Sequence, residues 1–295
     1  MRRVASVAAA FAVAATFSAS VSAVPAEIQT IRHEAVHRHG RLILSPFGID
    51  LRQLFPFISE TQWSTFDLDN LFKKDADDEA FDGEYERFLV FAGSDTWRNW
   101  AFAHAGILWS PGLLANEGFT LKLLINGGLY RYLSGSLDNS TVIGIQSSVT
   151  LMPGWRFKRA GYEIAVFAGL DVQRFRYVPV DPSASLIGTR YGLRGAVELW
   201  HEPSPTTMLA ADASVSSIGS GNSARIAYGW RVLDRFYLGP EAQVLQTEPY
   251  VLKRVGLHIT ALKLGTREWW TAGGYSNDND HRSGLYIRFG VLMRK

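Results

Sequence analysis

The side chains in this chain that can do acid–base or nucleophilic chemistry are scattered among apolar neighbours. An acyl-transfer site needs a nucleophile hydrogen-bonded to a base, which a third group orients. The residues that can fill these roles are His104, His258, Ser148, Ser214 and Asp212. The chain has no G-x-S-x-G elbow, and a lone histidine on a strand usually has a structural role. We therefore expect no catalytic residue and keep an enzyme acting on lipid or glycan as an alternative.

Two further arrangements could do chemistry. Glu198 and Glu241 could form a glycosidase pair, whose activity depends on a carboxylate separation that the sequence does not reveal. His33 and His37 are spaced so that a helix would carry both on one face, where they could bind a metal. No matching third ligand stands nearby, and the chain has no cysteine. We expect neither a metal nor another cofactor.

Charged residues give a clearer pattern. Polar and apolar residues alternate in many segments, and the charged residues occupy every second position, which we call one parity of the segment. This parity carries Lys122, Arg190, Arg194, Arg225, Arg231, Arg254, Arg288, Asp95, Glu163, Asp171, Glu198, Asp212, Glu241 and Glu268. A balanced set is typical of a confined space, where an unpaired charge is costly. Trp200 and Trp270 share the parity. Space filling is their simplest interpretation, and stacking on sugar rings is the functional one.

These side chains must be positioned by strands, because from Glu86 onward the sequence alternates with a period of two. Clusters of Gly, Pro, Asn and Asp separate the segments. The predicted strands are 86–94, 99–109, 118–132, 140–157, 161–175, 187–200, 206–217, 222–233, 235–247, 250–262, 266–276 and 284–293. An even number of such strands, about 12, favours an all-β, antiparallel barrel.

The two faces of these strands differ in polarity. In segment 161–175, Val166 and Leu170 alternate with Glu163 and Asp171. A soluble sheet would bury the apolar face, whereas a transmembrane β-barrel turns it toward lipid. The other face is rich in Arg, Glu, Asp and Gly, which favours a lumen, and its glycines would relieve crowding where the sheet curves inward. We predict a transmembrane barrel and keep a soluble periplasmic saccharide-binding β-barrel as an alternative.

The connections between the predicted strands support this orientation. One set comprises 110–117, 158–160, 201–205, 234 and 263–265, and the other comprises 95–98, 133–139, 176–186, 218–221, 248–249 and 277–283. The second set is on balance longer, which is typical of an outer-membrane barrel with both termini in the periplasm. Aromatic residues near the strand ends, among them Tyr130, Tyr132, Tyr250 and Trp269, would lie at the lipid headgroup levels. About 12 strands make too narrow a barrel for an open porin-like channel.

The N-terminus has the features of an export signal. A basic head ends at Arg3, an apolar run continues to Phe17, and small residues precede an expected cleavage after Ala23. This apolar run is too short to cross a membrane as a helix. We predict a signal peptide at 1–23, and hence an exported protein of the cell outer membrane in contact with its lipid.

The pattern of polar and apolar residues divides the rest of the chain into two parts. Residues 24–85 do not alternate and are expected to form a partly ordered periplasmic arm, whereas 86–295 form the barrel domain. The formal net charge of +2 leaves no basic stripe for nucleic acid. The absence of cysteine excludes disulfides and a lipoprotein anchor. Nothing in the sequence indicates an oligomeric state.

Six blocks along the strands resemble the cellulose biosynthesis protein BcsS family of bacterial outer-membrane proteins. They are 91–98 (FAGSDTWR), 105–112 (AGILWSPG), 128–132 (GLYRY), 153–157 (PGWRF), 198–203 (ELWHEP) and 235–241 (RFYLGPE). The resemblance runs from about residue 88 to the end. It leaves out the arm, and the chain ends Met293-Arg294-Lys295 where many outer-membrane barrels have a terminal aromatic residue.

This resemblance implies an envelope protein associated with making or exporting cellulose, and it offers no catalytic residues to carry over. Together with the charged, glycine-rich parity it predicts a non-catalytic outer-membrane accessory. Such a barrel would contact the glucan or anchor components of the cellulose synthase complex.

Overall fold

The computed structural model describes residues 43–44, 49–50, 86–247 and 250–295. The chain divides into two compact units, 1–80 and 81–295. The described part of the first unit is two short antiparallel strands, β1 (Ile43–Leu44) and β2 (Ile49–Asp50). The predicted signal peptide, the pair His33 and His37, and most of the predicted arm lie outside the described residues.

The described part of the second unit forms one closed barrel of 12 antiparallel strands, so the predicted strand number and pairing are confirmed. The strands are β3 (Phe88–Trp97), β4 (Trp100–Trp109), β5 (Gly118–Ser134), β6 (Ser140–Arg159), β7 (Tyr162–Val178), β8 (Gly188–Ser204), β9 (Thr207–Ser216), β10 (Asn222–Val232), β11 (Phe236–Thr247), β12 (Tyr250–Leu264), β13 (Arg267–Asp278) and β14 (Ser283–Arg294). A single 3-10 turn, η3 (Gly135–Leu137), connects β5 to β6.

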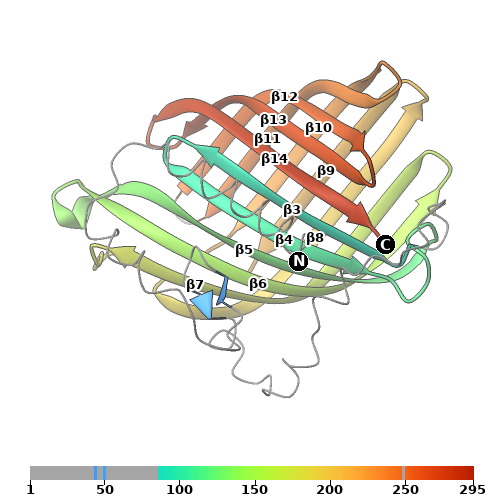
Figure 1. Ribbon diagram of the computed structural model, residues 1–295. Coiled ribbons are helices and arrows are strands. Elements are labelled where there is room, and N and C mark those ends of the chain that lie inside the picture. Colours follow the sequence, from blue (N-terminus) through green and yellow to red (C-terminus); the bar gives the residue numbers. More distant parts are fainter. Residues whose placement is uncertain (1–42, 45–48, 51–85, 248–249) are drawn as a thin grey trace. The chain divides into compact units, whose positions relative to one another are not determined.

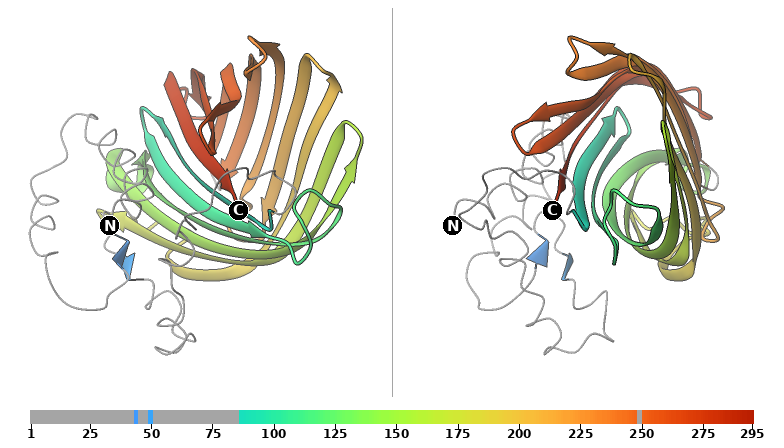
Figure 2. Two further views of the ribbon diagram at one scale, coloured as in Figure 1. Left: turned by 45° about the vertical axis from the view of Figure 1, so that its right-hand side comes forward. Right: turned by 90° about the vertical axis from the view of Figure 1, so that its right-hand side faces the viewer.

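Each strand pairs with its neighbours in sequence, and β14 pairs with β3 to close the barrel (Figures 1 and 2). Arg294 lies opposite Leu89 in this closing pair. Beyond it the carbonyl oxygen of Lys295 accepts hydrogen bonds from the backbone N–H groups of Arg87 and Phe88, both at 2.7 Å. A closed sheet satisfies the hydrogen-bonding groups that an open edge would leave unpaired.

The barrel has two rims. At one rim, called the terminal rim, β3 begins, β14 ends and the connection 110–117 is the longest. At the other, the loop rim, the connections include η3 and the segment 179–187. The wall is uneven, because β5 to β8 have 17 to 20 residues whereas β3 and β4 have 10 each. The long hairpin of β5 and β6 extends to the left in Figure 1.

The apolar parity of the strands faces outward and the charged parity faces the lumen, as predicted. The outward-facing Leu193 and Leu285 are 64% and 79% exposed. The inward-facing Asp171 and Arg254 are 0% and 2% exposed. No helix in the described parts of the chain is long and apolar enough to cross a membrane.

Inward-facing glycines give space to side chains from neighbouring strands. A Cβ atom on Gly290 would lie 2.5 Å from the Trp270 ring, and one on Gly144 would lie 2.5 Å from the Tyr130 ring. Glycine at these positions therefore relieves crowding, as predicted, and the nearest atoms belong to these rings. The rings lie close to the wall as a result.

Candidate functional site in the barrel lumen

Ion pairs connect the strands along the inner wall of the barrel. They are Lys122–Glu198, Arg156–Glu163 (2.6 Å), Lys158–Glu163 (3.5 Å), Arg194–Asp171 (2.9 Å), Arg225–Asp212 (2.7 Å), Arg225–Glu241 (3.6 Å), Arg231–Glu202 (3.9 Å), Arg254–Asp95 (2.6 Å) and Arg288–Glu241 (3.7 Å). These pairs include every basic residue proposed for the lumen except Arg190. That side chain is exposed, and none of the ion pairs between described residues includes it.

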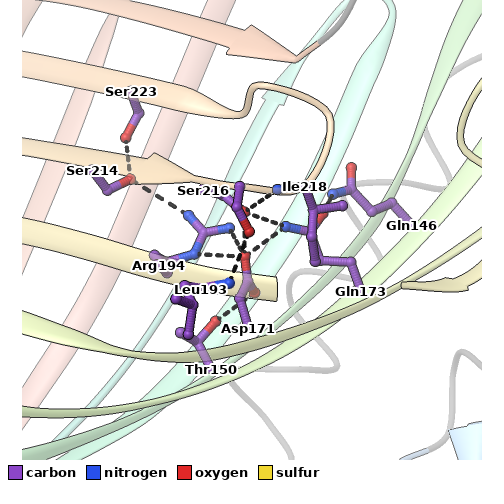
Figure 3. A network of polar contacts seen from close by, with 11 residues as sticks. Gln146, Thr150, Asp171, Gln173, Leu193, Arg194, Ser214, Ser216, Ile218 and Ser223 are labelled. Carbon is purple, nitrogen blue, oxygen red and sulfur yellow. Dashed lines mark hydrogen bonds and ion pairs between the residues drawn. The ribbon is translucent and has the colours of Figure 1, made fainter. Parts of the chain in front are cut away.

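Asp171 on β7 is the centre of the first polar cluster (Figure 3). Its Oδ2 accepts hydrogen bonds from Arg194 Nε (3.1 Å) and Nη2 (2.9 Å), and from Ser216 Oγ (2.6 Å). Gln173 Nε2 also donates to Oδ2 (2.8 Å), and Thr150 Oγ1 donates to Oδ1 (3.1 Å). The four partners come from β6, β7, β8 and β9, so one buried carboxylate joins four neighbouring strands.

The cluster continues on both sides of Asp171. Gln146 on β6 donates to Gln173 at 2.9 Å, and Ser214 on β9 lies 2.9 Å from Ser223 on β10. Polar contacts therefore run without interruption from β6 to β10. Full hydrogen bonding of this kind compensates the cost of burying a carboxylate.

Glu241 on β11 is the centre of the second cluster. Tyr286 donates a hydrogen bond of 2.9 Å to its Oε1, and the guanidinium groups of Arg225 and Arg288 lie 3.6 and 3.7 Å from its Oε2. Arg288 also donates to Gln243 Oε1 at 2.9 Å. Glu241 is 4% exposed, so its charge is balanced inside the lumen.

Several of these interactions join strands that share no backbone hydrogen bonds, and three pairs of strands are joined across two intervening strands. Lys122 on β5 reaches Glu198 on β8, Arg254 on β12 reaches Asp95 on β3, and Tyr286 on β14 reaches Glu241 on β11. In each case two strands lie between the partners. We call these three contacts the cross-lumen contacts, because each spans part of the lumen and narrows it.

Both proposed sugar-stacking tryptophans contact neighbouring side chains. The Arg288 guanidinium lies 5.3 Å from the Trp270 ring centroid, and the His104 ring stacks at 6.3 Å. Trp200 and Tyr237 form a T-shaped ring pair with centroids 6.0 Å apart, and the Trp200 indole N–H donates to Glu202 Oε1 at 3.1 Å. These contacts agree with the space-filling interpretation.

A row of aromatic rings lies inside the loop rim. Trp100 lies 6.3 Å from Tyr130 and 6.3 Å from Tyr250, Tyr130 lies 6.0 Å from Tyr132, and Tyr132 lies 6.1 Å from Tyr177, measured between centroids. We call these five residues the mouth aromatics. The prediction that Tyr130, Tyr132 and Tyr250 lie at the lipid headgroup level was wrong, because they have the inward parity of their strands.

A buried aspartate stands beside the mouth aromatics. Asp181 accepts hydrogen bonds from the hydroxyls of Tyr132 (2.7 Å), Ser136 (2.8 Å) and Ser183 (2.7 Å), and from the Ser183 backbone N–H (2.9 Å). Burial by itself raises the pKa of Asp181, but these hydrogen bonds favour the charged form and together bring the pKa below its usual value. The loop 179–187 is thereby tied to β5 and η3.

The candidate catalytic residues do not come together. His258 contacts Thr260 Oγ1 (2.8 Å) and the carbonyl oxygen of Tyr228 (3.2 Å), and His104 stacks on Trp270. The described hydrogen bonds of Ser214 go to Ser223 and Arg194, and Asp212 pairs with Arg225. Among the described residues, no group of three or more His, Asp or Glu could hold a metal ion.

Sequence reasoning missed several charged members of the lumen wall, among them Arg156 and Glu202. Arg156 pairs with Glu163, and the alternation in β6 already places Arg156 on the inward parity. Glu202 pairs with Arg231, but it lies in 201–205, which was predicted to be a connection after the strand 187–200. The strand instead continues to Ser204, with a register shift between His201 and Ser204.

Comparison with known proteins gives a family match over the barrel. The sequence pattern of the family described as "Cellulose biosynthesis protein BcsS" matches residues 89–295. No curated protein matches the chain.

Several solved structures are similar at low sequence identity. The KdgM porin has a TM-score of 0.41 and 9% identity, covering 70% of this chain and 98% of its own. The COG4313 outer membrane channel from Pseudomonas putida F1 has a TM-score of 0.44 and 9% identity, covering 76% and 100%. LpxR from Salmonella typhimurium has a TM-score of 0.39 and 9% identity, covering 70% and 99%.

Proposed function

The chain belongs to the cellulose biosynthesis protein BcsS family, and from that premise we propose that it is a non-catalytic β-barrel of the outer membrane that supports cellulose production or export. The observation that carries the proposal is the reversed polarity of the barrel, with an apolar outer wall around a charged interior. Membership of the family supports a role in cellulose production, and the apolar outer wall supports a position in the outer membrane.

The apolar outer wall supports a position in lipid. Large apolar side chains on many strands are exposed, among them Leu170 (62%), Val255 (61%) and Leu257 (60%). Soluble monomeric proteins rarely expose contiguous apolar patches of more than a few hundred Å². A soluble periplasmic saccharide-binding barrel would leave this wall in water, so lipid is the partner that we assign to it. The terminal rim then faces the periplasm.

The interior supports a role other than catalysis. Neither His104 nor His258 is hydrogen-bonded to a described serine, and Glu198 and Glu241 are each neutralised by basic neighbours. A general base needs to reach the proton that it takes. An enzyme acting on lipid or glycan therefore finds no assembled nucleophile–base pair in the described lumen.

We assign the contact with glucan to the mouth aromatics. Sugar rings stack on aromatic faces, and Asp181 and Arg282 bring polar groups to the same rim. Trp200 and Trp270 lie nearer the terminal rim, in contact with Tyr237 and with Arg288 and His104 respectively, and the proposal assigns them to lumen filling. In this proposal the terminal rim, on the periplasmic side, contacts components of the cellulose synthase complex.

The cross-lumen contacts argue against free passage of a polymer through the resting barrel. Planar-bilayer recordings with the purified protein are expected to show no steady large conductance, because wide aqueous pores use about 16 or more strands. A steady porin-like conductance would contradict this part of the proposal.

Two experiments test the proposal as a whole. Deletion of the gene in a cellulose-producing host is expected to alter the amount or fibre organisation of surface cellulose, and the wild-type gene should restore it. Unchanged cellulose would reject the role. Membrane fractionation and heat-modifiable gel mobility test the location, and recovery of the protein in the periplasmic fraction without detergent would favour the soluble alternative.

A further inference from the structure

Charge is distributed unequally between the two faces of the barrel wall. Within the described strands β3 to β14, every acidic side chain has the inward parity. The charged residues of the outward parity are all basic: Arg131, Arg159, Arg174, Arg176, Lys253 and Arg267. A wall that faced water would have no reason to exclude acidic residues in this way.

Most of these outward cations lie toward the loop rim. On β7, Arg174 and Arg176 continue the outward-facing row that contains the exposed Leu170 and the half-buried Val172. In the sheet register Arg176 lies opposite Ile145. Ile145 in turn lies opposite Leu129, two residues before Arg131 on β5. The three arginines therefore stand close together above the apolar part of the wall.

Arg174 and Arg176 have unused hydrogen-bonding capacity. Both side chains are exposed, and neither has a hydrogen bond or ion pair with another described residue. By contrast, Arg159 at the terminal rim is paired with Glu117. A guanidinium group is planar and donates in a fixed fork, which matches the oxygens of a phosphate.

Their position in the wall limits what they can meet. A charged side chain on the lipid face is costly in hydrocarbon and is tolerated at the interface, where the polar headgroups begin. Arg174 and Arg176 lie where the apolar stretch of β7 ends, so they mark that interface. The chemical groups available there to two unpaired cations are the anionic headgroups of lipids.

We propose that Arg174 and Arg176, with Arg131 beside them, bind the phosphate groups of an anionic glycolipid of the lipid A class at the loop rim. This inference rests on the proposed membrane position, with the loop rim in the outer leaflet. The bound lipid orients the barrel and fixes its depth, because the phosphates hold the arginines at one level.

The test measures binding of diphosphoryl lipid A to the full-length protein in non-ionic detergent, by native mass spectrometry. The Arg174→Gln/Arg176→Gln double variant is expected to bind about 30-fold more weakly. Arg267→Gln is the matched control, because Arg267 is an exposed outward arginine at the opposite rim. Its affinity should stay within about twofold of the wild type.

Two further arms identify the ligand group. Dephosphorylated lipid A should bind the wild type as weakly as diphosphoryl lipid A binds the double variant, and millimolar inorganic phosphate should not displace the lipid. Equal binding by the double variant, indifference to dephosphorylation, or displacement by inorganic phosphate would overturn the inference.

Failure of this inference and failure of the proposed function have different signatures. Heat-modifiable mobility establishes that each variant is a folded barrel. A folded, membrane-bound double variant that binds lipid A normally refutes only the phosphate site, whereas a wild-type protein recovered from the periplasm without detergent refutes the membrane position itself.

Discussion

Replacing Asp171 with alanine tests whether the lumen charges hold the barrel together. The substitution removes the acceptor of two hydrogen bonds from Arg194 and of one each from Ser216, Gln173 and Thr150. Loss of one partner of a buried ion pair costs about 3–5 kcal/mol. The Arg194 side chain remains 20% exposed and so keeps some water, which places the expected loss of unfolding free energy at about 3–4 kcal/mol.

A double-mutant cycle separates the pair from the rest of the cluster. Arg194→Ala leaves Asp171 charged and fully buried, and we expect a cost of about 3 kcal/mol. The double variant should lose less than the sum of the two single variants, by about 2 kcal/mol. The matched control is the exposed pair Arg159–Glu117, whose removal should cost at most about 1 kcal/mol.

The assay is urea unfolding of protein refolded into lipid vesicles, followed by tryptophan fluorescence. If Asp171→Ala folds too poorly to titrate, Asp171→Asn preserves the side-chain volume and should lose about 2 kcal/mol. The reasoning is refuted if the Asp171 variants cost no more than Glu117→Ala, or if the coupling energy with Arg194 is zero.

Three other predictions follow from the wall and the rims. Leu193→Arg places a charge in the middle of the outer wall and should cost about 2–4 kcal/mol in vesicles, whereas near-zero cost would indicate that this wall does not face lipid. Gly290→Ala should cost about 1–3 kcal/mol because its Cβ would lie 2.5 Å from Trp270, whereas Gly273→Ala, with its nearest atom at 3.5 Å, should be nearly neutral in the same unfolding assay. Asp181 has a lowered folded-state pKa, so its stabilisation of the loop 179–187 is present above the unfolded pKa of about 3.9 and is lost as the pH falls toward the folded value. Hydrogen exchange of the loop should therefore rise below about pH 4 in the wild type and be independent of pH over this range, after correction for intrinsic rates, in Asp181→Asn.

The alternation of the sequence was sufficient to predict the strands and their faces. The predicted strand 140–157 corresponds to Ser140–Arg159, and the assignment of Leu193 outward and Arg194 inward is confirmed. The physical reason is that the side-chain period of a strand is two, so one correct residue fixes the direction of the others as far as the next register shift.

Partners across the barrel could not be predicted in the same way. Local alternation places Arg254 and Asp95 in the lumen, but their contact depends on how far successive strands are shifted around the closed sheet. Tyr130 illustrates a different failure. Its position in the alternation of β5 places it in the lumen, and aromatic character alone does not distinguish a ring at the lipid interface from a ring inside the barrel.

The cross-lumen contacts bear on how such a barrel can be assembled. If β5 entered the bilayer before β8 joined the sheet, Lys122 would lack its partner Glu198. Such a partly assembled sheet would expose ionic groups that lipid solvates poorly. Intermediates with an open seam are therefore disfavoured, and the last strands to join release the largest share of the stabilisation. We expect barrel assembly to end in a single cooperative step. Cells would then contain either the complete barrel or an unfolded chain bound to periplasmic chaperones.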